Sequence, residues 1–310
     1  MKLLSSLALG TLCVIAVSGC TQVEGASVGS LPTTRSSGIV VGAFNFSESE
    51  LLAQLYGQAL SARGFDVRIL DEGAPRELLE PALEQGVVDL VPEYLGTASS
   101  WLGFGDAAAG NSSKATHKEL QSLLSERGLR ALEFAPAENK NEVVVTNDTA
   151  TQYNLHTISD LAPVAEELVF GGPPECRIRP LCLVGLESVY GMRFQSFQPL
   201  DAGGPLTVAA LNGGEVDVAL MFTTDAAIGA NGLVVLDDDR RLQPAENIVP
   251  VVSDALVLRH GAALAQALNS VSERLSPQTL TALNRQIAGG TSPQDAARAW
   301  LIALDLGAPR

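Results

Sequence analysis

The chain has 310 residues, of which 46% are hydrophobic, and its 35 acidic side chains outnumber its 20 basic ones to give a formal net charge of −15. A chain of this length can bury a sizeable core, as one large domain or two smaller ones. Because it has no surplus of basic residues to neutralise phosphates, the charge argues against electrostatic binding of nucleic acids or anionic lipid surfaces.

The first 19 residues have the pattern of a secretory signal peptide. Lys2 is followed by an apolar run over residues 3–17 and then by two small residues, Ser18 and Gly19, as in a segment that is cleaved on export. The run is shorter than the stretch of about 20 residues that a membrane-spanning helix needs. We therefore expect residues 1–19 to be missing from a mature, extracytoplasmic protein.

The residues around the expected cleavage point resemble the bacterial lipobox. In that motif Cys20 becomes the lipidated first residue of the mature chain; an ordinary signal peptide followed by an incidental cysteine is the alternative. Residues 20–37, rich in Ser, Thr and Gly, then form the lipid anchor and a flexible tether. This interpretation places the protein on the outer face of the cell membrane, attached through its N-terminal lipid.

From residue 39 onward the sequence alternates between predicted strands and helices. Ser47 and Glu50, three residues apart, predict a capping box at the start of the first helix, and Gly64 predicts its end. The repeated strand–helix–strand order predicts an α/β fold with mostly parallel sheets. In chain order, hydrophobic patterning predicts strands at 39–42, 65–70, 87–91, 143–146 and 168–171, and helices from 47, from 75, at 157–167, at 262–275, from 277 and from 293.

An internal near-repeat is the most informative feature of the chain. Residues 82–90 and 210–218 share an Ala-Leu pair, a glycine, a Val-Asp pair and a following aliphatic residue. Each copy predicts a helix end, a glycine cap and a buried strand that carries one aspartate, Asp89 or Asp217. A chance recurrence of a common α/β pattern is the alternative explanation.

Each copy also has an aromatic residue five positions after its aspartate, namely Tyr94 and Phe222. Threonines follow, at position 97 in one copy and at 223 and 224 in the other. Because ligands bind beyond the carboxyl ends of strands in open α/β sheets, we expect each copy to contribute a ring and a hydroxyl group to such an edge. If two lobes face one another, these groups lie across a cleft.

Cys176 and Cys182 are the cysteines that remain in the expected mature fold besides Cys20. Such a close pair in an exported protein, flanked by Pro and Gly residues, predicts a local disulfide that fixes a loop. The five intervening residues do not match common zinc spacing, and no histidine lies nearby.

The sequence carries few signs of enzymatic chemistry. The three histidines, at 117, 156 and 260, lie in predicted surface helices or loops, and none accompanies a Gly-x-Ser-x-Gly motif. Phosphate-binding and dinucleotide-binding motifs are absent, and Asp237–Asp239 indicates a solvated turn more than a calcium loop. We therefore expect no catalysis, no cofactor and no metal site; a hydrolytic enzyme is the alternative from another class.

Several segments together resemble the substrate-binding proteins of ABC importers for glycine betaine, choline, carnitine and proline, of the ProX/OpuBC type. The resemblance covers about residues 39–304. It depends on the run Val41–Glu48, the stretch Pro81–Thr97 with its Pro-Glu-Tyr-x-Gly-Thr segment, the turn Thr223–Asp225, and Leu236–Asp239 followed by Pro250–Val252. The loop Gly171–Cys176, its partner Cys182 and the segment Leu200–Pro205 resemble the actinobacterial branch.

The resemblance implies a bilobed periplasmic-binding-protein fold of type II, with two α/β lobes joined by two crossover hinges. It implies a first lobe of residues 38–142 and 230–310 and a second lobe of residues 143–229, with hinges near 141–145 and 222–233. The lobes would close over a small solute and present it to the permease and ATPase subunits of an importer. The receptor itself would be a monomer.

In that family, aromatic rings hold a quaternary ammonium, and a basic residue with neighbouring donors holds a carboxylate. By position, Tyr94 and Phe222 become walls of the aromatic box, Thr97 a hydroxyl donor and Arg179 the carboxylate-binding residue, while Phe46 is expected in the core. The ligand-binding residues implied are Phe44, Asn45, Tyr94, Thr97, Asn139, Asn141, Arg179, Phe222, Thr224 and Glu246.

Three departures leave this aromatic box incomplete. Phe44 stands where many members have Lys, Asn139, Asn141 and Glu142 occupy a stretch where many have Asn-x-Tyr, and Glu246 takes the place of a further Tyr. The alternatives are therefore the same fold with a sugar, polyol or phenolic ligand, and a ligand-sensing lipoprotein without a transport role.

Overall fold

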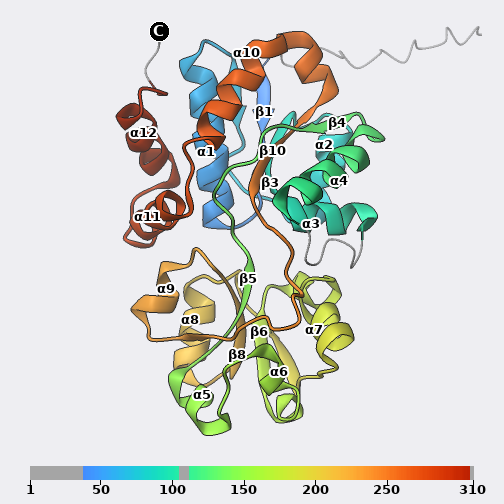
Figure 1. Ribbon diagram of the computed structural model, residues 1–310. Coiled ribbons are helices and arrows are strands. Elements are labelled where there is room, and N and C mark those ends of the chain that lie inside the picture. The colour runs from blue at the N-terminus through green and yellow to red at the C-terminus, as the bar shows by residue number, and fades with distance from the viewer. Residues whose placement is uncertain (1–37, 105–111, 308–310) are drawn as a thin grey trace, which may run out of the picture. The chain divides into compact units, whose positions relative to one another are not determined.

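The computed structural model describes residues 38–104 and 112–307, which belong to one unit of the chain, Ser36–Arg310. The strands in these residues form two five-stranded sheets, of order β2-β1-β3-β10-β4 and β7-β6-β8-β5-β9. We call the parts built on these sheets the first and the second lobe (Figure 1). The predicted signal peptide, Cys20 and the tether lie outside the described residues. No helix of the described part is long and apolar enough to span a bilayer.

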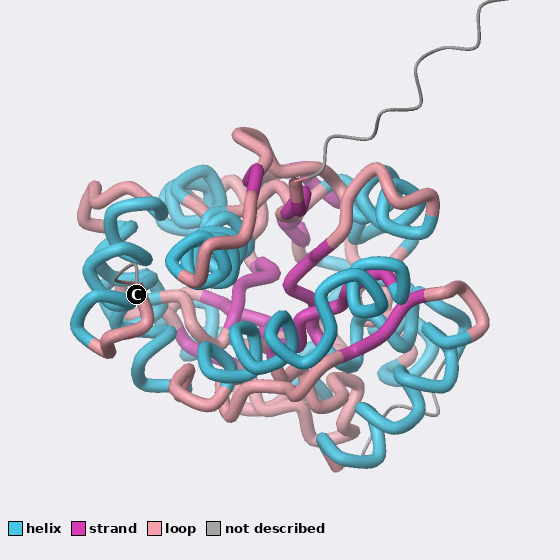
Figure 2. Tube along the Cα trace, turned by 90° about the horizontal axis from the view of Figure 1, so that it is seen from above, coloured by secondary structure: helices cyan, strands magenta, loops and turns pink. Residues whose placement is uncertain are grey.

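Helices flank the strands in both lobes (Figures 1 and 2). The first lobe contains β1 (Ile39–Val41), α1 (Ser47–Ala62), β2 (Val67–Ile69), α2 (Arg76–Glu84), β3 (Leu90–Tyr94), α3 (Leu95–Ser99), the π-helix η1 (Ser100–Phe104), α4 (Ser113–Ser125), β4 (Leu129–Ala131), β10 (Ile248–Ser253), α10 (Asp254–Ser272), α11 (Pro277–Ala288) and α12 (Pro293–Ala303). The second contains β5 (Asn141–Val145), α5 (Asn147–Tyr153), α6 (Ile158–Leu161), the 3-10 helix η3 (Ala165–Glu167), β6 (Val169–Gly172), the 3-10 helix η4 (Pro174–Ile178), α7 (Leu183–Tyr190), β7 (Ser196–Pro199), α8 (Pro205–Gly213), β8 (Val218–Phe222), α9 (Ala226–Ala230) and β9 (Val234–Val235).

Both sheets are mixed, whereas the sequence predicts mostly parallel sheets. In the first lobe β1 is parallel to β2 and β3, but β10 is antiparallel to β3 and β4. In the second lobe β6 is parallel to β7 and β8, but β5 is antiparallel to β8 and β9. The antiparallel strands β5 and β10 are those that arrive from the other lobe. The local strand–helix pattern of the sequence does not reveal the direction of these two strands in their sheets.

The two copies of the near-repeat occupy equivalent places in the two lobes. Gly86 and Gly214 both have a left-handed backbone, with φ of 65° and 69°, and end α2 and α8. Asp89 then accepts a hydrogen bond from the Val40 N–H at 3.0 Å, and Asp217 accepts one from Val169 N–H at 2.8 Å. Each aspartate thus links the strand that follows it to a parallel neighbour, β1 beside β3 in the first lobe and β6 beside β8 in the second.

Several predicted boundaries differ from the structure. The Ser47–Glu50 capping box is wrong, because α1 starts at Ser47 without a side-chain cap and the Ser49 hydroxyl instead accepts a hydrogen bond from the Phe44 N–H. The strand expected at 87–91 is β3, which starts only at Leu90 because residues 86–88 still wrap the end of α2. The helices predicted from 277 and from 293 are confirmed, and Ser276 and Ser292 cap them with side-chain hydroxyls that accept backbone N–H bonds.

The two chain crossings lie beside each other and are hydrogen-bonded. Glu138 and Asn247 form an antiparallel bridge, the Asn139 N–H donates to the Glu246 carbonyl, and the Ile248 N–H donates to the Ala137 carbonyl. Because β9 pairs with β5, the second sheet extends beyond residue 230, where the sequence analysis began the return to the first lobe. The crossings therefore fall at about residues 132–140 and 238–247.

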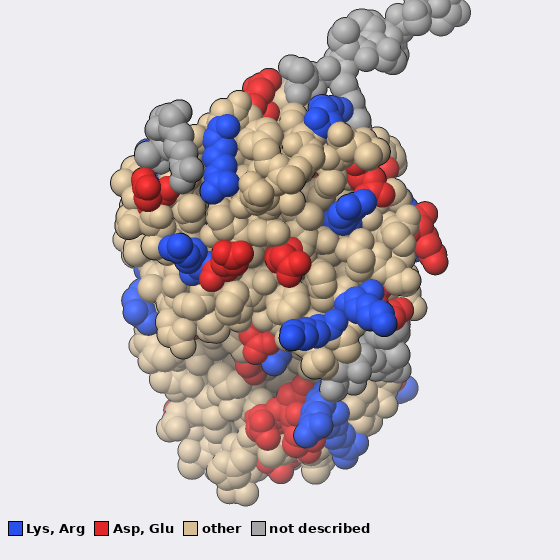
Figure 3. All heavy atoms as spheres, turned by 45° about the horizontal axis from the view of Figure 1, so that its top comes forward, with Lys and Arg blue, Asp and Glu red and all other residues tan. Residues whose placement is uncertain are grey.

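Charged side chains are interspersed on the surface. On the face that Figure 3 shows, Lys and Arg side chains lie among Asp and Glu side chains and among a larger area of other residues. This face of the described residues has no broad area of basic charge that would suit a polyanion.

The equivalent aspartates give the first testable prediction. Asp89→Ala leaves the buried Val40 N–H without its acceptor, so it should lower the free energy of unfolding by about 1–3 kcal/mol. Asp217→Ala should act in the same direction in the second lobe. Urea denaturation measures both, with Asp71→Ala, an exposed position, as the control. Variants as stable as the control would show that these aspartates do not fix the sheets.

Candidate functional site

A cavity of about 290 Å³ is lined by residues of both lobes. The first lobe contributes residues at the start of α1, at the end of β3 and in η1, and the second contributes the end of β8 and the loop around η4. Eight of the ten ligand-binding residues expected from the sequence line it: Phe44, Asn45, Tyr94, Thr97, Asn139, Asn141, Arg179 and Phe222.

Four aromatic rings form a stacked group in the wall of the cavity, with Phe46 at its centre. The Phe46 ring centroid lies 6.3 Å from that of Phe44, 6.1 Å from that of Tyr94 and 5.7 Å from that of Phe222, with interplanar angles of 4°, 30° and 23°. Phe46 packs against the first-lobe core and also lines the cavity. The sequence analysis favoured only the first of these roles for Phe46.

Arg76 is a cavity residue that sequence reasoning missed. Its guanidinium lies 4.3 Å from the Phe44 ring centroid, and its side chain is only 5% exposed. It donates to Glu80 at 2.9 Å and makes a bidentate contact with Glu93. From the sequence, Arg76 and Glu80 form an ordinary i,i+4 pair on a helix surface, so only the fold reveals that the pair is buried.

In the buried cluster around Arg76, one of the two acidic side chains balances the arginine charge. Burial raises the pKa of Glu80 well above its ordinary value, which favours the neutral acid. Burial would also raise the pKa of Glu93, but the Arg76 charge and its hydrogen bonds lower it instead. The positive charge of Arg76 is therefore balanced by Glu93 and is not free for a ligand.

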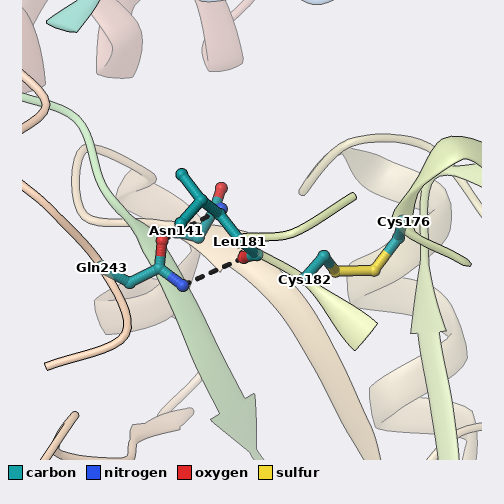
Figure 4. The surroundings of a disulfide bond; sticks show 5 residues. All are labelled: Asn141, Cys176, Leu181, Cys182 and Gln243. Carbon is teal, nitrogen blue, oxygen red and sulfur yellow. Dashed lines mark hydrogen bonds between the residues drawn. A yellow bond between two sulfur atoms is a disulfide. The ribbon is translucent and has the colours of Figure 1, made fainter. Parts of the chain in front are cut away.

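A disulfide closes the loop that forms the second-lobe wall of the cavity. Cys176 and Cys182 are bonded, as predicted, and both line the cavity. Figure 4 shows the Asn141 and Gln243 side chains directed at the Leu181 carbonyl, to which each amide donates at 3.0 Å. One carbonyl next to the disulfide thus ties the loop to β5 and to the second crossing.

Arg179, the expected carboxylate-binding residue, already has an acidic partner. Its Nη2 lies 2.9 Å from the Glu77 carboxylate of α2, and its guanidinium carbon lies 5.6 Å from the Trp101 ring centroid. Its Nε is buried and has no acceptor among the described residues. Arg179 thus links the disulfide loop of the second lobe to Glu77 and Trp101 of the first lobe.

Two of the expected ligand-binding residues, Thr224 and Glu246, do not line the cavity. Glu246 is 1% exposed and accepts hydrogen bonds from the N–H groups of Gly96 and Thr97 and from the Thr97 hydroxyl, at the start of α3. Thr224 is 3% exposed and donates to Glu48, which sequence reasoning did not single out. Both side chains lie behind the wall, where they support residues that face the cavity.

The acidic turn that the sequence analysis assigned to solvent has a structural role. The Asp238 carboxylate accepts hydrogen bonds from the Tyr190 hydroxyl and from the N–H groups of Leu242 and Gln243.

Across the described ranges, no group of His, Cys, Asp and Glu side chains is placed to hold a metal ion. The cavity is therefore best described as an aromatic surface with amide, hydroxyl and paired ionic groups around it.

Comparisons with known proteins identify relatives over most of the chain. Residues 37–303 match the family described as the substrate binding domain of an ABC-type glycine betaine transport system. The glycine betaine-binding protein YehZ of Escherichia coli is 30% identical over 84% of this chain and 88% of its own length. A glycine-betaine-binding protein of Pseudomonas aeruginosa is 28% identical over 80% and 81%. The solved structure of a glycine betaine/carnitine/choline ABC transporter protein superimposes with a TM-score of 0.66 at 24% identity, covering 87% of this chain and 99% of that chain.

Three carboxyl groups near the site, Glu246 buried and Glu142 and Asp225 half-buried, predict a pH dependence of stability. Burial raises the pKa of Glu246, Glu142 and Asp225 to about 7 in each case. Between pH 7 and their ordinary values the folded protein holds more protons than the unfolded chain, so stability should increase as the pH falls from 8 to about 5. Each group contributes at most about 1.4 kcal/mol per pH unit.

The melting temperature from pH 8 to pH 5 measures this effect. Glu246→Gln should flatten the rise, because the variant has no proton to take up at that position. Glu133→Gln, at an exposed position, should leave the profile unchanged. An unaltered rise in Glu246→Gln would mean that Glu246 does not titrate near neutral pH.

Proposed function

Because the chain belongs to the family of substrate-binding domains of ABC-type glycine betaine transport systems, we propose that it captures a quaternary ammonium solute, such as glycine betaine or choline, in the cavity between its lobes. One observation carries this proposal. The rings of Phe46, Tyr94 and Phe222 come from both lobes, stack on one another and line the cavity.

Stacked rings suit a quaternary ammonium because such a cation has no N–H group to donate. It is attracted instead to the negative face of an aromatic ring, by about 2 kcal/mol or more when water is excluded. The names of the relatives agree with such a ligand, since they include glycine betaine-binding proteins and a carnitine transport binding protein of Listeria monocytogenes. The ammonium end would therefore lie against Phe46 and its neighbours.

The arginines restrict where a carboxylate of a zwitterionic solute could bind. Arg76 is balanced by Glu93, and Arg179 is paired with Glu77. Of these two pairs only the second is partly exposed, at 21% for Arg179 and 35% for Glu77. A solute carboxylate would therefore compete with Glu77 for Arg179, and the ammonium group would supply most of the affinity.

The same proposal includes the cellular location of the protein and its partners in transport. The bound solute would be delivered to a permease with its ATPase subunits by a monomeric receptor, held outside the cytoplasm by a lipid on Cys20. The lobes would close by bending the paired crossings at about 132–140 and 238–247, and affinity would be set by the difference in binding between the closed and open states.

Cation–π binding predicts a specific pattern of affinities. Choline should bind more tightly than its neutral carbon analogue, 3,3-dimethylbutan-1-ol, which has nearly the same shape. Phe46→Leu keeps apolar volume but removes the ring, so it should weaken choline binding about tenfold and change the affinity for the neutral analogue little. Isothermal titration calorimetry on both ligands measures the effect.

Phe197→Leu is the matched control, because this second-lobe ring stacks on Phe170 and does not line the cavity. If glycine betaine, choline and carnitine all fail to bind while a sugar, polyol or phenol does, the amine assignment is wrong and the cavity serves another class of solute.

Lipid anchoring predicts that the intact protein fractionates with membranes. Cys20→Ala should release it into the soluble fraction, whereas Cys13→Ala, inside the expected signal peptide, should leave it membrane-bound. Mass spectrometry of the N-terminal peptide provides an independent measurement. A mature chain with an unmodified Cys20 would exclude this part of the proposal.

A further inference from the structure

Glu48 is a buried acid that no expectation from the sequence assigned to the site. It lies in the first turn of α1 and is 4% exposed. Its Oε1 accepts hydrogen bonds from the Tyr94 hydroxyl at 2.8 Å and from the Asn139 amide at 2.6 Å, and its Oε2 accepts them from the Thr224 hydroxyl at 2.6 Å and from the Asn284 amide. A carboxylate has about four acceptor sites, so all of them are in use.

These four donors are neutral, and no cation of the described residues forms an ion pair with Glu48. Burial of a carboxylate costs free energy unless hydrogen bonds replace its water. Each donor therefore matters to the group as a whole, because the loss of one leaves an acceptor in a place that water does not reach. This constraint holds the four donor side chains in fixed positions.

The donors come from the parts of the molecule that have to act together when a solute binds. Tyr94 belongs to the aromatic wall, and Asn139 lies in the first chain crossing. Thr224 follows β8 of the second lobe by two residues, and its N–H and the Thr223 hydroxyl both donate to the side-chain oxygen Oδ1 of Asn139. Asn284 lies on α11, at the side of the first lobe that contacts α9.

We propose that Glu48 is a positioning residue that couples the cavity to the hinge. One carboxylate fixes the Tyr94 ring of the first lobe and, through Thr224, the end of β8 that carries Phe222 of the second lobe. A solute that orders these two rings therefore also restrains the crossing at Asn139. The inference rests on the proposed function in one respect, namely that the cavity beside Tyr94 is where the solute binds.

The decisive experiment measures the distance between the lobes without any ligand. Spin labels at Lys118→Cys on α4 and Gln152→Cys on α5, both exposed positions, report on it by pulsed electron paramagnetic resonance. Thr224→Val removes one hydroxyl and keeps the shape, so it should broaden the distance distribution. Thr224→Ser keeps the hydroxyl and should restore the parent distribution.

Glu48→Gln and Glu50→Gln form the second matched pair. Glu50 lies in the same first turn of α1, but its side chain makes no hydrogen bond or ion pair among the described residues. Glu48→Gln should broaden the distribution and Glu50→Gln should not. The Asn284 Oδ1, which is buried without a donor in the described part of the chain, can turn to accept the new amide, so the Thr224→Val effect should be the larger one.

A binding measurement separates coupling from plain stability. With choline and glycine betaine as probes, Tyr94→Phe and Thr224→Val should each weaken binding about threefold to tenfold, and their effects should not add. In the Glu48→Gln background the Thr224→Val effect should shrink, because the amide nitrogen that faces Thr224 cannot accept its hydroxyl, whereas the Tyr94→Phe effect should remain, because the amide oxygen still accepts from Tyr94. Failure of both probes to bind would reject the proposed function, while the distances would still decide the role of Glu48. Unchanged distances in Thr224→Val and Glu48→Gln, with only a lower melting temperature, would overturn the inference.

Discussion

The hydrogen-bonded pairing of the two chain crossings is the constraint on which the cavity depends. Each crossing continues directly into a strand, and that strand lies antiparallel to the one that ends in an aromatic residue. Asn141, the first residue of β5, is paired with Phe222, and Ile248, the first residue of β10, is paired with Tyr94. The ring from each lobe is therefore fixed next to the point where the chain enters that lobe, and any bending of the crossings moves the two rings relative to one another.

The buried ionic groups around the cavity hold the residues of its wall in place. Arg76 is balanced by Glu93, Glu246 receives the N–H groups at the start of α3, and Glu48 receives four neutral donors. In each case the protein supplies the partners that burial requires, so the group holds its neighbours in place and does not bind a solute charge. The stacked aromatic rings also face the cavity, and their surfaces attract a cation without needing a counter-ion.

Much of this arrangement could be predicted from the sequence, because the near-repeat depends on residues that are close together in the chain. A helix end, a left-handed glycine and an aspartate place Tyr94 and Phe222 at equivalent sheet edges, and the close cysteine pair indicates its own disulfide. The roles of Phe46, Arg76 and Glu48 could not be found in the same way. Each depends on contacts with residues distant in the chain, and an acid in the first turn of a helix normally indicates only a favourable charge at its N-terminus.

Two polar contacts join the lobes around the cavity, and their surroundings give them different consequences. The Glu77–Arg179 pair is partly exposed, so water and salt screen it, and such pairs contribute about 0–1 kcal/mol. The Glu48–Thr224 hydrogen bond is buried, so its loss leaves an unsatisfied acceptor. Under the proposed function we therefore expect a solute carboxylate to displace Glu77 at little cost, whereas the loss of the Thr224 hydroxyl would leave Glu48 without one of its donors. On this proposal the Glu77–Arg179 pair would break when the solute binds, and the Glu48–Thr224 hydrogen bond would persist as the lobes move.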